Sequence, residues 1–156
     1  TYETAGWGDG EQLYNRLMYY YGNDSVHVVP EAAYAWAMSK DGKKLYFAIR
    51  DGLIFYDPWD NKTFPMTPED VAYSINRMIA SANYEKVDYP EWIISEFVKS
   101  AHVISKDEMT KILSGGLEAP VLGKSYTVSS MDQWISLFKD RFSYVSWHKA
   151  KTGIAG

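Results

Sequence analysis

A short polar turn between two strand-like segments constrains the fold of this chain more than any other feature. Apolar residues are frequent in residues 34–39, and Leu45, Phe47 and Ile49 fall on one face of the segment 44–50. Asp41-Gly42 lies between the two segments, and glycine there can adopt the positive φ that a tight hairpin turn requires. The sequence therefore predicts a β-hairpin made of residues 34–39 and 44–50.

Helical spacing and capping signals predict helices elsewhere. One covers residues 11–21, and the others begin after Thr67, Asp88, Ser105 and Ser130. A Ser, Thr or Asp at these positions can accept a hydrogen bond from the first turn of the helix. The side chains expected to face a core in three of these helices are Val71, Ile75, Met78, Ile79 and Ala82; Ile93, Ile94, Phe97 and Val98; and Trp134, Ile135, Phe138 and Phe142.

The remaining segments carry weaker signals. Residues 102–104 and 126–128 are interpreted as short strands, and a turn at Asp51-Gly52 leads into the apolar residues 53–56. Residues 57–63 and 117–124 are interpreted as loops, and the short helix after Ser105 is expected to end at Gly115-Gly116. Because strands cluster early and helices late, we expect an α+β fold with a small antiparallel sheet and a β-hairpin, packed by several helices.

Length and composition limit the possible classes of protein. The chain has 156 residues, which is typical of one domain, so we expect residues 1–156 to form a single domain. The net charge is −4 and the basic residues are scattered, which argues against nucleic acid as a partner. The apolar stretches are only a few residues long, whereas a membrane span needs about 20 residues. There is no cysteine, which excludes thiol catalysis and disulfides.

No motif in the sequence predicts catalysis, a cofactor or a metal site. Residues 6–10 are glycine-rich but lack the spacing and the lysine of a phosphate-binding loop, so they are interpreted as a turn. His27, His102 and His148 are far apart and show no metal-ligand spacing. Asp57 and Asp60 could act as paired acids or bind calcium weakly, although two acids on a turn are more often solvated. We expect a protein that is not an enzyme.

Aromatic side chains are the most plausible ligand contacts. They make up 16% of the chain, and most of them are needed for packing. Trp7 and Trp59 both lie in segments marked by glycine or proline, which favours exposed turns. They are the candidate ligand-binding residues, and the alternative interpretation is that both only pack.

Four segments between residues 14 and 79 occur in a distinctive order. They are Pro30-Glu31-Ala32-Ala33-Tyr34-Ala35-Trp36, Ser39-Lys40-Asp41-Gly42, Leu45-Tyr46-Phe47-Ala48-Ile49-Arg50-Asp51-Gly52-Leu53 and Thr67-Pro68-Glu69-Asp70-Val71-Ala72-Tyr73-Ser74. Together they resemble the family 5 extracellular solute-binding proteins, the oligopeptide, dipeptide and nickel-binding subunits of ABC importers. Residues 55–62 depart from the family, which has a shorter turn at this place.

The resemblance implies transport of a small solute without chemistry. Proteins of this family close two lobes around a solute and are several times longer than this chain, so the chain is expected to be one subdomain of such a protein. The implied ligand is an oligopeptide, or else an oligosaccharide, and the implied partner is an ABC permease. The implied location is extracellular or periplasmic at the cell surface, with membrane contact only through an anchor of the parent protein. Two alternatives are a carbohydrate-active enzyme domain and a protein-interaction module.

Overall fold

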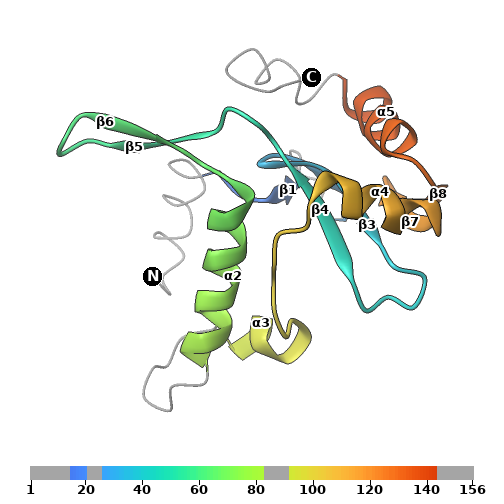
Figure 1. Cartoon of the computed structure of the whole chain (residues 1–156), viewed down its shortest axis with the longest axis horizontal. Helices are drawn as coiled ribbons and strands as arrows, with labels where there is room; N and C mark the ends of the chain where they lie inside the picture. The colour runs from blue at the N-terminus through green and yellow to red at the C-terminus, as the bar shows by residue number, and fades with distance from the viewer. Residues whose placement is uncertain (1–14, 21–25, 83–91, 144–156) are drawn as a thin grey trace.

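The computed structural model describes residues 15–20, 26–82 and 92–143 (Figure 1). The order of elements is β1 (Met18–Tyr20), β2 (Val28–Pro30), β3 (Ala33–Met38), β4 (Leu45–Ile49), β5 (Ile54–Asp57), β6 (Lys62–Pro65), α2 (Pro68–Ala82), α3 (Trp92–Phe97), α4 (Lys106–Ser114), β7 (Leu117–Val121), β8 (Lys124–Val128) and α5 (Met131–Phe142). The fold is α+β with small antiparallel sheets and hairpins, as predicted.

The predicted hairpin of residues 34–39 and 44–50 is confirmed as β3 and β4. The two strands pair antiparallel from Met38 opposite Leu45 onward, and Gly42 in the turn has a φ of 71°. The Asp41 carboxylate accepts hydrogen bonds from the Ser39 hydroxyl at 2.6 Å and from the backbone N–H of Lys43 at 3.1 Å. Glycine and a turn-forming aspartate therefore fix the register of this hairpin locally.

The central sheet joins strands from both halves of the chain. Its strand order is β4-β3-β7-β8, so residues 117–121 form a strand where a loop was predicted. Leu117, Ala119 and Val121 are buried on one side of β7, which is the alternation of a half-buried strand. The loop interpretation was wrong because the small Ala119 and the adjacent Pro120 weaken the local strand signal, whereas pairing with β8 and β3 stabilises the strand.

Aromatic side chains of α5 form the centre of the core. Trp134, Phe138 and Phe142 are buried, as predicted, and the Phe138 ring meets the Trp36 ring edge-on at 4.5 Å between centroids. The Trp134 indole N–H donates to the backbone carbonyl of Trp36 at 2.9 Å, and the Trp36 indole N–H donates to that of Pro120 at 2.8 Å. These two bonds connect α5 to β3 and β3 to β7.

The predicted starts of three helices are confirmed. Ser105 and Ser130 accept hydrogen bonds from the backbone N–H groups of Glu108 and Gln133, both at 3.2 Å, at the starts of α4 and α5. Helix α2 begins at Pro68, and there the Asp70 carboxylate accepts from the N–H of Thr67 at 2.8 Å and from its hydroxyl at 3.1 Å. The apolar face of α2 is only half-buried at Val71, Ile75, Met78 and Ile79.

The hairpin of β5 and β6 and the helix α2 extend from the central sheet (Figure 1). Within residues 51–80 and 95–108, no side chain is fully buried. The buried core consists of side chains that lie before residue 51 or from Met109 onward. Among the residues that the structure describes, the core therefore lies in the central sheet with its strand neighbours, α4 and α5.

Besides the loop predicted for residues 117–124, four further predictions were wrong. Residues 18–20 of the predicted helix 11–21 form β1, which pairs with β2, and residues 11–14 lie outside the described chain. The spacing of apolar residues near position 18 fits both periods, and pairing with β2 selected the strand. The predicted loop 57–63 is shorter, because Asp57 belongs to β5 and residues 62 and 63 belong to β6. Phe97 was expected in the core but is 81% exposed.

The fourth error concerns residues 102–104, which were predicted as a strand and have no regular structure. The Asn76 side chain of α2 donates to the carbonyl of Ala101 at 2.6 Å and accepts from its N–H at 2.9 Å. The Asn76 side chain therefore makes the hydrogen bonds to the Ala101 backbone that, in a sheet, the backbone of a neighbouring strand would make.

No described helix has the length and apolar character that a membrane crossing requires.

Candidate functional site

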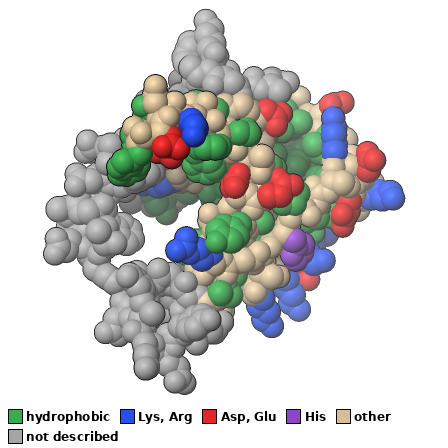
Figure 2. Space-filling view, turned by 60° about the vertical axis from the view of Figure 1, so that its left-hand side comes forward, with side chains coloured by type: hydrophobic (Ala, Val, Ile, Leu, Met, Phe, Trp, Pro, Cys, Tyr) green, Lys and Arg blue, Asp and Glu red, His purple; other side chains and the backbone are tan. Residues whose placement is uncertain are grey.

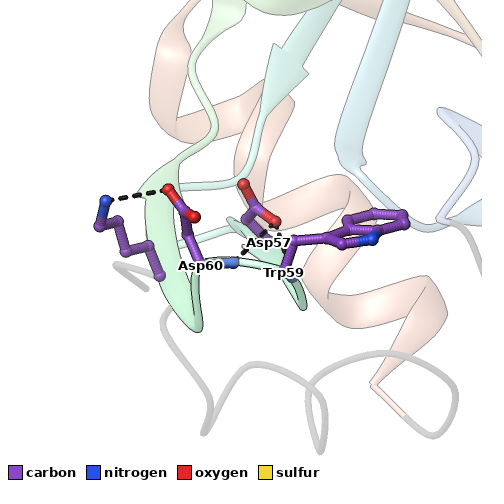
Figure 3. Close-up of polar contacts among 4 residues, drawn as sticks. Asp57, Trp59 and Asp60 are labelled. Atoms are coloured by element: carbon purple, nitrogen blue, oxygen red, sulfur yellow. Dashed lines mark hydrogen bonds and ion pairs between the residues drawn. The ribbon is translucent and has the colours of Figure 1, made fainter.

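Trp59 lies in the turn that joins β5 to β6 (Figure 3). Asp57 ends β5, and its carboxylate accepts hydrogen bonds from the backbone N–H groups of Trp59 at 2.9 Å and Asp60 at 3.4 Å. Asn61 completes the turn with a φ of 50°, which asparagine tolerates better than most residues. Local hydrogen bonding by Asp57 and the conformation of Asn61 therefore place Trp59 at the tip of a hairpin.

The two acids of this turn do not face a common point. Asp57 binds the backbone of its own turn, and the Asp60 carboxylate accepts a hydrogen bond from the Lys62 ammonium at 3.0 Å. Both Asp60 and Lys62 are exposed, so their ion pair contributes little to stability. Asp57 therefore forms the turn and Asp60 forms a surface ion pair, as expected of two solvated acids on a turn. Two carboxyl groups that flank a substrate would instead face each other across a cleft.

The Trp59 side chain is 91% exposed. In Figure 3 its indole extends to the opposite side from the Asp60 carboxylate. The turn therefore presents a flat aromatic surface to solvent, which can stack on an apolar or planar group of a ligand. The alternative interpretation, that this tryptophan only packs, does not hold within the described part of the chain.

Other candidates from the sequence are outside the described residues or remain dispersed. Trp7, the glycine-rich residues 6–10 and His148 all lie outside the described ranges. Within those ranges, His27 and His102 belong to no group of three or more residues that could hold a metal ion.

A polar cluster beside β1 and β3 was missed by the sequence analysis. Arg50 is only 4% exposed, and its backbone N–H donates to the Ala32 carbonyl at 2.9 Å. The Nε atom of Arg16 lies 3.8 Å from the Glu31 carboxylate. Burial lowers the pKa of Arg50, and the nearby Glu31 charge acts in the opposite direction. The sequence signal that could have identified Arg50 as part of this cluster is its position directly after the strand-forming residues 44–49.

Tyr34 lies close to this cluster in the sequence and is half-buried. Burial raises the pKa of its phenol, and the negative charge of Asp51 raises it further. The phenol therefore stays protonated over the physiological pH range and can act there as a hydrogen-bond donor. The cluster connects the start of β3 to the end of β4.

Comparison with known proteins gives one partial similarity. No family model matches the chain, and no solved structure matches it. A stretch of 74 residues, 47% of the chain, is 36% identical to the peptide transport periplasmic protein SapA of Haemophilus influenzae. The chain covers 13% of the length of that protein. This similarity agrees with the resemblance to solute-binding proteins, over about half of the chain.

Proposed function

We propose that this chain is part of one lobe of an extracytoplasmic solute-binding protein that captures a peptide-like solute for an ABC importer. The observation that carries the proposal is the 36% identity to a peptide transport periplasmic protein. The four motifs of the sequence point to the same class independently of that comparison. In this proposal the protein performs no chemistry, and contact with the membrane occurs through an anchor of the parent protein.

The motifs map onto elements that build the scaffold. Residues 30–36 lead into β3, residues 39–42 form its turn, residues 45–53 contain β4, and residues 67–74 begin α2. Their functions in the structure are a positive φ at Gly42, a pair of strands and a helix start. This arrangement supports the proposal for the scaffold, and the identity of the solute must come from other residues.

The partial-lobe part of the proposal rests on length and on shape. The chain covers only 13% of its relative, and Trp59 projects from a hairpin tip. Small-molecule sites usually bury most of the ligand surface in a concave pocket. A projecting tryptophan can supply one wall of such a pocket, and the facing wall would come from another part of a two-lobed protein.

Titration calorimetry with panels of peptides and oligosaccharides tests this proposal. We expect the isolated chain to bind no tighter than the millimolar range, because each tenfold loss of affinity needs only about 1.4 kcal/mol of lost contacts. Any weak signal should come from peptides and should disappear in Trp59→Ala. Phe97→Ala is the matched control, since Phe97 is also a highly exposed aromatic residue.

Three results would contradict the proposal. Micromolar binding of a peptide by this chain alone would show that it contains a complete site. A preference for oligosaccharides would change the solute class, and turnover of a glycoside would assign the chain to the carbohydrate-active enzymes.

A rise in melting temperature with added peptide provides an independent measure of binding.

A further inference from the structure

The β5–β6 hairpin exposes apolar side chains on both of its faces. Ile54 and Tyr56 are 62% and 60% exposed on one face, and Phe55 and Phe64 are 47% and 50% exposed on the other. In the described part of the chain, this sheet contains only these two strands. A space-filling view shows hydrophobic side chains at the surface between acidic and basic ones (Figure 2). Exposed apolar strands of this kind are typical of interaction surfaces.

The two edges of the hairpin differ in how well they resist pairing. Strand β6 contains Lys62 and Pro65, which are residues that natural edge strands use against association. Strand β5 has neither lysine nor proline along Ile54–Asp57. The outer edge of β5 is therefore the edge that can accept another strand.

The hydrogen bonding inside the hairpin determines which backbone groups face that edge. The N–H of Met66 donates to the carbonyl of Leu53 at 2.8 Å, so Leu53 and Met66 form a hydrogen-bonded pair. The next pair along the ladder is Ile54 opposite Pro65. Hydrogen-bonded and non-hydrogen-bonded pairs alternate along an antiparallel ladder. The N–H and C=O groups of Ile54 and Tyr56 therefore point outward from β5.

We propose that the outer edge of β5 pairs with the same edge of a second copy of this chain. Antiparallel pairing that uses the outward groups places Ile54 opposite Tyr56 of the second copy, and Tyr56 opposite Ile54 of that copy. The twofold axis then passes between the two Phe55 residues. The result is a four-stranded antiparallel sheet with both β6 strands at its outer edges.

This register is self-complementary in its side chains. Phe64 lies opposite Phe55 in the hairpin, so the dimer forms a row of four phenylalanine rings on one face. Ile54 contacts Tyr56 of the second copy on the other face. Asp57 falls opposite Leu53, so no two like charges are directly opposed across the new edge.

The available area fits a weak dimer. A Phe or Tyr side chain carries about 150–250 Å² of surface, so the half-exposed side chains of Ile54, Phe55 and Tyr56 beside the new edge offer at most about 300 Å² per copy. A standard interface buries about 800 Å² per partner, and smaller ones are transient. Dimerisation should therefore depend on concentration and appear between about 10 µM and about 1 mM.

Sedimentation velocity of the full chain and of edge variants tests the pairing. Tyr56→Pro removes an outward N–H from β5, and Ile54→Lys adds a charge to the same edge without changing the backbone. We expect both variants to dimerise at least about tenfold more weakly than the unchanged chain. Thr63→Pro is the matched control, because Thr63 lies directly opposite Tyr56 on the other edge, and this variant should dimerise normally.

A cysteine variant tests the register. The chain contains no cysteine, so Phe55→Cys introduces one thiol at the position that faces itself across the twofold axis. The Cα separation of about 4.5 Å in a non-hydrogen-bonded pair is within the range of disulfides. Under mild oxidation, Phe55→Cys should form covalent dimers much faster than Ile54→Cys, whose thiols would be offset.

Several outcomes would overturn the proposal. The first is a chain that stays monomeric throughout the concentration range, and the second is dimerisation that Thr63→Pro weakens as much as Tyr56→Pro does. Equal cross-linking of the two cysteine variants would reject the register. Circular dichroism of each variant at low concentration identifies any that fail to fold, and the two cysteine variants decide the question if both edge variants unfold.

Discussion

At the scale of single residues, backbone conformation matters most in the turn between β7 and β8. Leu122 and Gly123 have φ values of 49° and 76°, so both occupy the left-handed region. Hairpin turns of two residues with this conformation favour asparagine followed by glycine. Leucine pays a steric cost there because its Cβ approaches the neighbouring carbonyl oxygen.

Replacing Leu122 by asparagine should therefore stabilise the protein. Leu122→Asn is expected to raise the free energy of unfolding by at most about 1 kcal/mol, because relief of the left-handed leucine is favourable. Leu122 is 40% exposed, so loss of the contacts of its buried part opposes this gain. Urea unfolding measures the change, and Asn61→Leu at the other positive-φ site should destabilise by a similar amount. A less stable Leu122→Asn variant would contradict this account.

The carboxyl group of Glu118 should titrate below its usual range. Its two oxygens accept hydrogen bonds from the hydroxyls of Ser125 at 2.7 Å and Thr127 at 2.9 Å, which lower its pKa by favouring the charged form. Because the folded pKa is lowered, this contribution to stability is present above the unfolded pKa and is lost as pH falls through the folded pKa. Carbon-detected NMR titration should show the Glu118 pKa rising in Ser125→Ala, and an unchanged pKa would refute the cause.

At the scale of elements, two helices illustrate how burial determines stability. Phe138 of α5 is completely buried against Trp36, whereas Phe97 of α3 is 81% exposed. Phe138→Ala is expected to cost about 3–5 kcal/mol, because it removes buried surface and leaves a cavity. Phe97→Ala is the matched control and should change stability by less than about 0.5 kcal/mol. Denaturant unfolding at low protein concentration measures both, and equal effects would contradict the placement of α5.

At the scale of the whole molecule, stability should be distributed unevenly. In the described part of the chain, the buried core belongs to the central sheet with its neighbours, α4 and α5, and no side chain within residues 51–80 and 95–108 is fully buried. Regions without buried apolar contacts open at low free energy. The hydrogen bonds of the Trp36 and Trp134 indoles instead join segments that are 84 and 98 residues apart in the sequence.

Hydrogen exchange measures this distribution directly. In dilute solution, the amides of β3, β7 and α5 should exchange only through global unfolding. The amides of β5 and β6 should exchange much faster, although they form a regular ladder. Equal protection of both regions would show that the hairpin is held by contacts beyond those described.

Sequence patterns predicted the elements whose stabilising groups are close in sequence. The hairpin of β3 and β4 depends on Asp41 and Gly42, and the starts of α4 and α5 depend on the serines that cap them. The turn at Trp59 was also predicted, because Asp57 and the residues that it binds are close neighbours. Each of these signals needs only a few adjacent residues to form its hydrogen bonds.

Tertiary structure alone decided the features that depend on distant partners. Residues 117–121 became a strand through pairing with β8 and β3, and residues 18–20 became one through pairing with β2. The exposure of Trp59 and the burial of Arg50 likewise depend on which segments fold against them. Pairing and burial are properties of residues brought together from far apart in the chain, so a local pattern cannot contain them.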